Sequence, residues 1–264
     1  MAELRRMRIS FWPLVLHVCA ATVSPLPPTA STVLPRMPLD SGICITRASP
    51  GNYLLCKRIA ILAMTAFYGE PSPWMGPVAN VQRGLIASDV LDDVAARLRF
   101  YEEARRRNLP HLGAVFLAED VASETVVGFV DVGLSLWDTR RRQFKLPKRP
   151  EGDWGEEPPS HLWLRPYISN LAVDARFRQR GVGRQLVAAC EDEVRRWDSK
   201  CHSDAWLEVS MQNSAAIEFY ERCGFEYVAE TRGREVVKKR FTYESSDVRR
   251  ALMKKSVLGA ERAR

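Results

Sequence analysis

Apolar residues recur along the chain with two different spacings, and the order of these spacings predicts the order of the elements. Spacings of three and four predict helices, which are the segments 53–68, 88–107, 182–197 and the residues after Asn213. Short apolar or alternating runs predict strands, which are the segments 43–48, 114–119, 126–136, 167–173, 205–209, 225–230 and 247–255, with a further charged, strand-like segment at 236–243. This order of strands and helices indicates an α/β domain.

Polar segments separate these elements. Residues 69–84 are rich in proline and predict a loop, after which Ser88 or Asp89 would cap the next helix. Residues 137–161 predict a polar insertion, because the basic run Arg140–Arg142 is followed by an acidic, proline-rich patch. Such a run is typical of a solvated loop, and the binding of an acidic or peptide partner is the alternative.

The first 42 residues show no pattern of a fold. Three arginines precede an apolar stretch, and a segment rich in Pro, Ser and Thr follows. This series resembles a bipartite targeting leader, so we expect residues 1–42 to direct the protein to a plastid (chloroplast), with mitochondrial import or a disordered tail on a cytoplasmic protein as alternatives. The domain then spans residues 43–256, and residues 257–264 form a basic tail.

The composition narrows the class of protein. Of the 264 residues 46% are hydrophobic, which is ample for a packed core, and no apolar run is long enough to predict membrane insertion. The net charge of +7 lies mainly in the first 68 residues, so the folded part gives no reason to expect nucleic-acid binding. The six cysteines form no C-x-x-C pair and no zinc-ligand pattern, which predicts free thiols and no metal site.

The strongest chemical signal is the stretch 167–183, which reads YISNLAVDARFRQRGVG. A strand ends in a charged turn, and Gly181 and Gly183 then open a helix. The first N–H groups of a helix have no partner inside it and carry the positive end of the helix dipole, so this turn predicts a site for a phosphate or diphosphate. A P-loop is excluded because no Lys-Ser or Lys-Thr pair follows Gly183, and a dinucleotide fold because residue 186 is Leu.

Two motifs resemble the GNAT superfamily of acetyl-CoA-dependent N-acetyltransferases. The motif positions are Arg178, Gly181 and Gly183 in the first, and Asn213, Ala216, Tyr220, Gly224 and Phe225 in the second. The resemblance is close over residues 167–225 and looser over residues 43–256. It implies an α/β (α+β) GNAT fold, in which a mixed, mostly antiparallel sheet of six to seven strands has a central splayed strand pair and flanking helices. It also implies acetyl-CoA as co-substrate.

The same resemblance assigns roles to residues. Main-chain groups of the central strand would pair with the pantetheine arm, the N–H groups of the turn would bind the diphosphate, and three arginines would supply countercharge. Asn213 would bond the pantetheine amide or cap the helix that follows it. Tyr220 would be the general acid for the CoA thiolate, its alternative role being that of a core tyrosine. The cofactor-binding positions implied are Leu171, Ala172, Val173, Arg178, Gln179, Arg180, Gly181, Val182, Gly183, Arg184, Asn213 and Tyr220.

The general base has a weaker signal, because the central strand carries no carboxylate at its start. Tyr167 matches a tyrosine that relays a proton through water in some N-terminal acetyltransferases of the family. Glu208, on the next strand, would be the partner of that water, and water alone is the alternative base.

We therefore expect an N-acetyltransferase that transfers the acetyl group of acetyl-CoA directly to a primary amine within a ternary complex. The leader and the motifs resemble plastid GNAT enzymes that acetylate protein N-termini and lysines, so the expected partner is a protein or peptide amine substrate. A small-molecule amine, such as a polyamine or an amino acid derivative, is the alternative acceptor. The alternative of another class is a non-catalytic acyl-CoA-binding protein.

Overall fold

The computed structural model describes residues 42–49, 51–70, 76–106, 113–145, 160–197, 203–238 and 242–257. The strands are β1 (Ile43–Arg47), β2 (Gly113–Asp120), β3 (Thr125–Asp138), β4 (Gln143–Lys145), β5 (Leu162–Val173), β6 (Asp204–Ser210), β7 (Glu226–Lys238) and β8 (Tyr243–Ser256). The helices are α1 (Tyr53–Tyr68), α2 (Pro77–Arg106), α3 (Val182–Arg196) and α4 (Ser214–Arg222). The predicted leader and basic tail lie outside the described residues, apart from Gly42 and Val257.

The described strands form one eight-stranded sheet in the order β1-β2-β3-β5-β6-β8-β7, with β4 beside β3. All neighbours are antiparallel except β5 and β6, which run parallel. The predicted mixed, mostly antiparallel sheet is therefore confirmed, and the short strand β4 adds one to the expected number.

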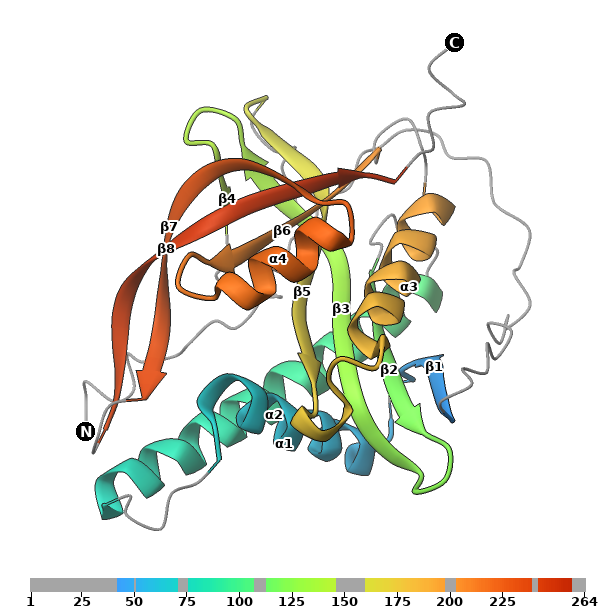
Figure 1. The fold of residues 1–264 in the computed structure, drawn as a ribbon, viewed down its shortest axis with the longest axis vertical. Helices are drawn as coiled ribbons and strands as arrows, with labels where there is room; N and C mark the ends of the chain where they lie inside the picture. The colour runs from blue at the N-terminus through green and yellow to red at the C-terminus, as the bar shows by residue number, and fades with distance from the viewer. Residues whose placement is uncertain are drawn as a thin grey trace.

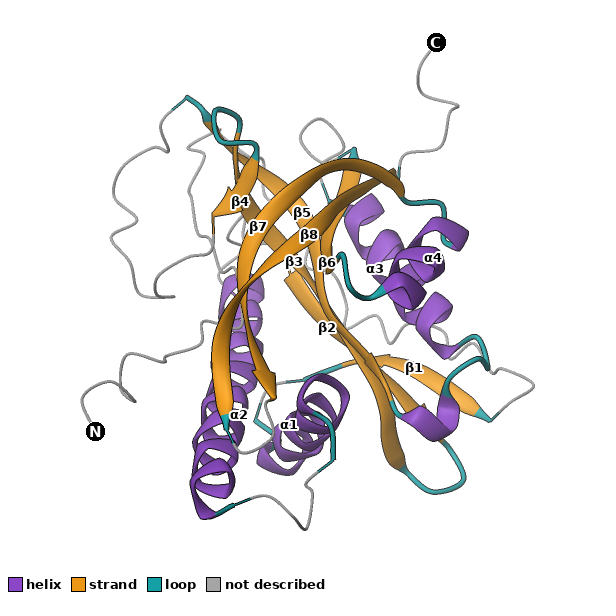
Figure 2. Ribbon diagram, turned by 60° about the vertical axis from the view of Figure 1, so that its left-hand side comes forward, coloured by secondary structure: helices purple, strands orange, loops and turns teal. Residues whose placement is uncertain are grey.

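Helices cover both faces of this sheet (Figures 1 and 2). One core cluster lies between the sheet and α3, around Phe116, Leu186 and Leu207. A second lies between the sheet and the pair α1 and α2, around Ile59 and Leu98. Each face thus buries the apolar stripe of its helices, which explains why the sheet can hold apolar residues on both sides. No helix in the described part of the chain is long and apolar enough to span a membrane.

The start of α2 differs from the prediction. The helix begins at Pro77, inside the segment 69–84 that was expected to be a loop, so Ser88 and Asp89 lie within it and do not cap it. Proline suits the first position of a helix, because its φ is already helical and its missing N–H would have no partner there. A proline-rich composition therefore indicated the wrong boundary.

Two further segments are more regular than expected. The insertion predicted at 137–161 begins within the sheet, because β3 runs to Asp138 and β4 pairs with it. Asp138 Oδ1 accepts the N–H groups of Arg140 and Arg141, each at 3.0 Å, and so fixes the turn that carries the basic run. Residues 146–159 lie outside the described part. The two C-terminal segments expected at 225–230 and 236–243 form one long strand, β7, up to Lys238.

Candidate active site

The centre of the sheet opens where β5 and β6 part. The two strands share a single parallel pair, Tyr167 with Trp206, and β6 continues along β8. Beyond Tyr167, β5 is bonded to β3 alone among the described strands. An extended ligand could thus pair with the free side of β5 at Leu171–Val173, where Val173 O already accepts a bond from Arg178 Nε.

A bulge marks the middle of this opening. Phe129 and Asp131 of β3 face Ala172 and Ser169 of β5, so β5 holds one residue more than β3 between these pairs. Asn170 takes up the irregularity with a φ of +56°. Asparagine tolerates this left-handed conformation better than most residues, because its short side chain bonds locally.

The turn after β5 has the geometry of an anion site. Gly181 caps α3 in the left-handed conformation, with a φ of +82°. The first N–H that bonds back within this end of the helix belongs to Gln185, which donates to Gly181 O at 3.2 Å. The N–H groups of Val182, Gly183 and Arg184 therefore point out of the helix end, where an anion can accept them.

Gly183 lies where α3 packs closely against α4. A Cβ at this position would lie 3.2 Å from Phe219 Cζ on α4. The absence of a side chain lets the first turn of α3 approach α4 closely, which brings the turn and the Tyr220 helix together.

The three arginines of the turn take different positions. Arg178 Nε donates to Val173 O at 3.0 Å and so ties the turn to the end of β5. The guanidinium of Arg180 lies over the ring of Phe177, with 5.2 Å to its centroid. Arg184 is exposed on α3. Arg178 thus has a structural bond in addition to its predicted role as a countercharge.

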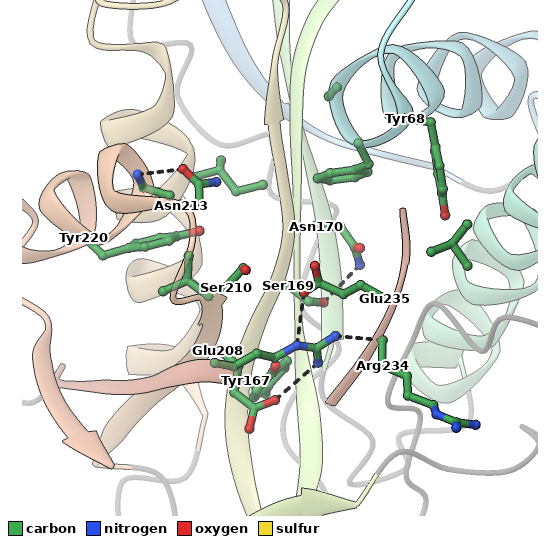
Figure 3. A pocket seen from close by; sticks show the side chains of 17 residues that line it. Tyr68, Tyr167, Ser169, Asn170, Glu208, Ser210, Asn213, Tyr220, Arg234 and Glu235 are labelled. Carbon is green, nitrogen blue, oxygen red and sulfur yellow. Dashed lines mark hydrogen bonds and ion pairs between the residues drawn. The ribbon is translucent and has the colours of Figure 1, made fainter. Parts of the chain in front are cut away.

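A cavity of about 430 Å³ lies at the opening between the strands. Figure 3 shows its walls on either side of β5. One wall, which we call the α4 side, consists of Leu171, Val209, Ser210, Asn213, Ala216 and Tyr220. The other, which we call the α1 side, consists of Ala66, Phe67, Tyr68, Asn170, Arg234, Glu235 and Val236. Tyr167, Ser169, Glu208 and Arg250 complete the lining between them. The predicted catalytic residues therefore meet in one cavity, whereas the turn 178–184 lies outside its lining.

Two predicted residues on the α4 side have clear local geometry. Asn213 Oδ1 accepts the Ala216 N–H at 3.1 Å, so it caps α4 and leaves its Nδ2 as a donor. The Tyr220 hydroxyl has no hydrogen-bond partner among the described residues. Burial raises the pKa of Tyr220 above its ordinary value, and the nearby thiols of Cys190 and Cys223 add to the shift. Tyr220 therefore keeps its proton at neutral pH.

The two candidates for the base lie together. Burial raises the pKa of Tyr167, and the charge of the adjacent Glu208 raises it further. The pKa of Glu208 is also raised by burial, against the opposing effects of the Thr231 hydroxyl, the Arg250 charge and a bond from Tyr167. Thr231 Oγ1 donates to Glu208 Oε1 at 2.8 Å. Glu208 is thus held in place as a carboxylate whose proton affinity is increased.

Arg250 was not found by sequence reasoning. Its Nη1 lies 3.6 Å from Glu208 Oε2 and its Nε 3.2 Å from Glu235 Oε1, so it links the two carboxylates of the cavity. A Cβ at Gly233 would lie 2.8 Å from Arg250 Cζ, so the glycine makes room for the guanidinium on β7. The only signal in the sequence was this isolated glycine between two predicted strand segments.

Most residues of the α1 side were not predicted from the sequence either. Tyr68, at the end of α1, packs edge-on against Tyr243 of β8, with ring centroids 6.0 Å apart. Gln82 of α2 bonds both main-chain groups of Tyr243, at 3.0 Å to its N–H and 3.4 Å to its carbonyl, and Arg83 bonds its hydroxyl at 3.1 Å. The hairpin of β7 and β8 is therefore fastened to α2 beside the cavity.

Comparison with known families agrees with this geometry. A model of the acetyltransferase (GNAT) family matches residues 86–225, more than half of the chain. The chain belongs to this family. The match includes both motifs, the parted strands and the Tyr220 helix.

Curated relatives share the central part of this GNAT chain. It is 36% identical over 69 residues to N-alpha-acetyltransferase 30 of Saccharomyces cerevisiae, which covers 26% of the chain and 38% of the relative. It is 43% identical over 58 residues to the ribosomal protein bS18-alanine N-acetyltransferase of Salmonella typhimurium, covering 22% and 37%. The alignments thus span less than half the length of these curated relatives.

Solved structures resemble the chain over a larger extent. Arabidopsis thaliana NAA60 in complex with acetyl-CoA is 16% identical, with 81% of this chain and 98% of that chain covered and a TM-score of 0.47. Salmonella typhimurium yncA with acetyl-CoA is also 16% identical, with 83% and 95% covered and a TM-score of 0.45.

Proposed function

We propose that this GNAT protein transfers the acetyl group of acetyl-CoA to a protein amine, first of all the α-amine of a protein N-terminus. The observation that carries the proposal is the meeting of Tyr220, Asn213, Tyr167 and Glu208 in one cavity at the parting of β5 and β6. A proton donor and a proton acceptor thereby face the same space from two strands and a helix.

The residues fit acetyl-CoA. The free side of β5 would take the pantetheine arm as an added strand, and Asn213 Nδ2 would donate to one of its amides. The N–H groups of Val182, Gly183 and Arg184 would bind the diphosphate, with Arg180 and Arg184 nearby as countercharges. Bound there, acetyl-CoA supplies an activated acetyl group as a thioester.

The chain would supply the proton transfers. As the C–N bond forms and the C–S bond breaks, Glu208 would take the amine proton through a water beside Tyr167, and Tyr220 would give its proton to the sulfur. Burial raises the pKa of Tyr220, but it also raises the pKa of thiols in this region, as the neighbouring Cys190 and Cys223 show. Burial would therefore shift the pKa of the phenol and that of a thiol bound beside it in the same direction.

Two observations support a protein acceptor. The relatives that match the central part are named as an N-alpha-acetyltransferase and as a ribosomal protein bS18-alanine N-acetyltransferase. The α1 side of the cavity is mixed in character, because the rings of Phe67 and Tyr68 line it together with the carboxylate of Glu235. Such a wall can bind both the backbone and the first side chain of a peptide.

Mass spectrometry of acetylated peptides tests the proposal. We would compare a lysine-free peptide with a free α-amine, the same peptide blocked at its N-terminus and carrying one lysine, and a polyamine. The first is expected to be acetylated fastest. Faster acetylation of the polyamine would favour a small-molecule enzyme. Binding of acetyl-CoA without transfer to any of the three amines would leave a non-catalytic acyl-CoA-binding protein.

A further inference from the structure

Asn170 lines the cavity, yet neither the family motifs nor the proton transfers above give it a role. It sits at the bulge of β5 with a φ of +56° and belongs to the α1 side. Its Oδ1 accepts no hydrogen bond from any residue within the described ranges. An oxygen of this kind at the wall of a cavity is open to an N–H of a ligand.

The orientation of the Asn170 carboxamide follows from its neighbour. The Ser169 hydroxyl has one proton, which it donates to Asp131 Oδ2 at 3.0 Å. The Ser169 oxygen is therefore left to accept, and it accepts from Asn170 Nδ2 at 3.2 Å. Figure 3 shows this bond, with the carboxamide oxygen turned away from Ser169. Asn170 Nδ2 therefore has a hydrogen-bond partner, and Asn170 Oδ1 is left as a free acceptor.

Asp131 enforces this direction because it accepts bonds and has none to give. It is 2% exposed, and the guanidinium of the equally buried Arg97 contacts its Oδ2. The Tyr101 hydroxyl donates to its Oδ1 at 3.0 Å. Burial raises the pKa of Asp131 to about 6 against the lowering effects of Arg97, Ser169 and Tyr101, so this carboxylate is an anion at neutral pH. Ser169 can therefore act toward it only as a donor.

The network is built into the fold. A Cβ at Gly113 would lie 2.0 Å from Tyr101 Cε1, and one at Gly133 would lie 2.5 Å from the Tyr101 hydroxyl. Two glycines on neighbouring strands thus form the slot that brings this tyrosine from α2 to Asp131. A side chain at either position would displace the Tyr101 hydroxyl. This hydroxyl donates to Asp131, on which the orientation of Ser169 depends.

We infer that Asn170 determines acceptor specificity: its Oδ1 accepts the N–H of the first peptide bond of the substrate, while Ser169 and Asp131 are positioning residues. This inference rests on the proposed function and narrows it to α-amines. In a protein N-terminus a peptide N–H lies three bonds from the reacting nitrogen, whereas a lysine side chain or a polyamine has a methylene group there. The reacting amine itself is served by Glu208 and Tyr167.

Two peptides and two variants test the inference. The peptides share one sequence, and the second carries a methyl group on the nitrogen of its first peptide bond. The wild-type protein is expected to prefer the unmethylated peptide by about tenfold in kcat/KM, since a lost bond leaves Asn170 Oδ1 unpaired. Asn170→Gly, which tolerates the positive φ, should reduce that preference to about twofold or less. Ser169→Ala should reduce it partway by releasing the carboxamide.

The outcomes distinguish a failure of the inference from a failure of the proposed function. Equal rates of the wild-type protein with both peptides would overturn the inference and leave the proposed function standing. A tenfold preference that persists in Asn170→Gly would also overturn it, because the methyl group would then act by bulk alone. Acetylation of neither peptide, despite bound acetyl-CoA, would refute the proposed function and the inference with it.

Discussion

The two walls of the cavity are built in different ways. The residues of the α4 side all lie between positions 171 and 220, on β5, β6 and α4 and the turn between them. The α1 side collects residues 66–68 from α1, Asn170 from β5 and residues 234–236 from β7. The first wall is local in sequence, and the second is assembled from distant segments.

The two walls also differ in the chemical groups that they present to the cavity. The α4 side offers main-chain groups, a capping asparagine and one phenol, and glycine at positions 181 and 183 keeps the adjacent anion site open. The α1 side offers the aromatic rings of Phe67 and Tyr68 and the carboxylate of Glu235. Under the proposed function, the α4 side would bind the acetyl donor and the α1 side the acceptor.

Tyr220→Phe should give the largest effect, and on the α4 side alone. Loss of the hydroxyl removes the proton donor for the sulfur, so kcat should fall about 100-fold. The dissociation constant of acetyl-CoA, measured by calorimetry, should stay within about twofold, because the ring remains. Tyr227→Phe is the matched control, since Tyr227 is 55% exposed and does not line the cavity. An unchanged kcat in Tyr220→Phe would remove the general acid from the mechanism.

The corresponding variant on the α1 side is Glu235→Gln. It weakens the pair with Arg250 and changes the charge that faces the acceptor. The KM of the peptide should rise a few-fold with the affinity for acetyl-CoA unchanged. A loss of acetyl-CoA affinity here would break the division between the two walls.

Glu208 lies between the two walls, and its contribution to kcat/KM should depend on pH. A base must be ionised, and burial raises the pKa of Glu208, so kcat/KM should fall as the pH is lowered through this raised pKa. Glu208→Gln should lower kcat/KM about tenfold at neutral pH and flatten that acid limb. Thr231→Val removes the donor that lowers the pKa of Glu208, so it should move the limb to higher pH. If the pH profiles of kcat/KM had the same acid limb in the wild-type protein and in both variants, Glu208 would be excluded as the base.

The sequence predicted the α4 side because its elements are continuous. A strand, a glycine turn and a helix follow one another from Tyr167 onward, so spacing alone placed the N–H groups of the anion site. Asn213 and Tyr220 lie two turns apart on one capped helix, whose position relative to the glycine turn follows from the family motif. The fold was predictable for the same reason, since most of its elements carry a clear period of their own.

The α1 side was not predictable, because nothing local links its residues. Tyr68, Glu235 and Arg250 meet only after the β7–β8 hairpin docks on α2. Asn170 had no predicted role, since its position depends on a bulge set by the register of β5 on β3. A side-chain period along one strand cannot show such a shift. The start of α2 at Pro77 was missed because the same residue type ends some helices and begins others.

The smallest effect should come from the glycine turn, and two variants separate its two requirements. Gly183→Ala places a Cβ 3.2 Å from Phe219 Cζ, so α3 must move away from α4 by a few tenths of an ångström. We expect the dissociation constant of acetyl-CoA to rise about threefold, with little change in stability. Gly181→Ala meets no atom within 4 Å but keeps a φ of +82°, so it should cost about 1 kcal/mol in the free energy of unfolding. Calorimetry of ligand binding and of unfolding measures both. Equal losses of stability in the two variants would mean that close packing of α3 on α4 stabilises the fold and does not specifically shape the donor site.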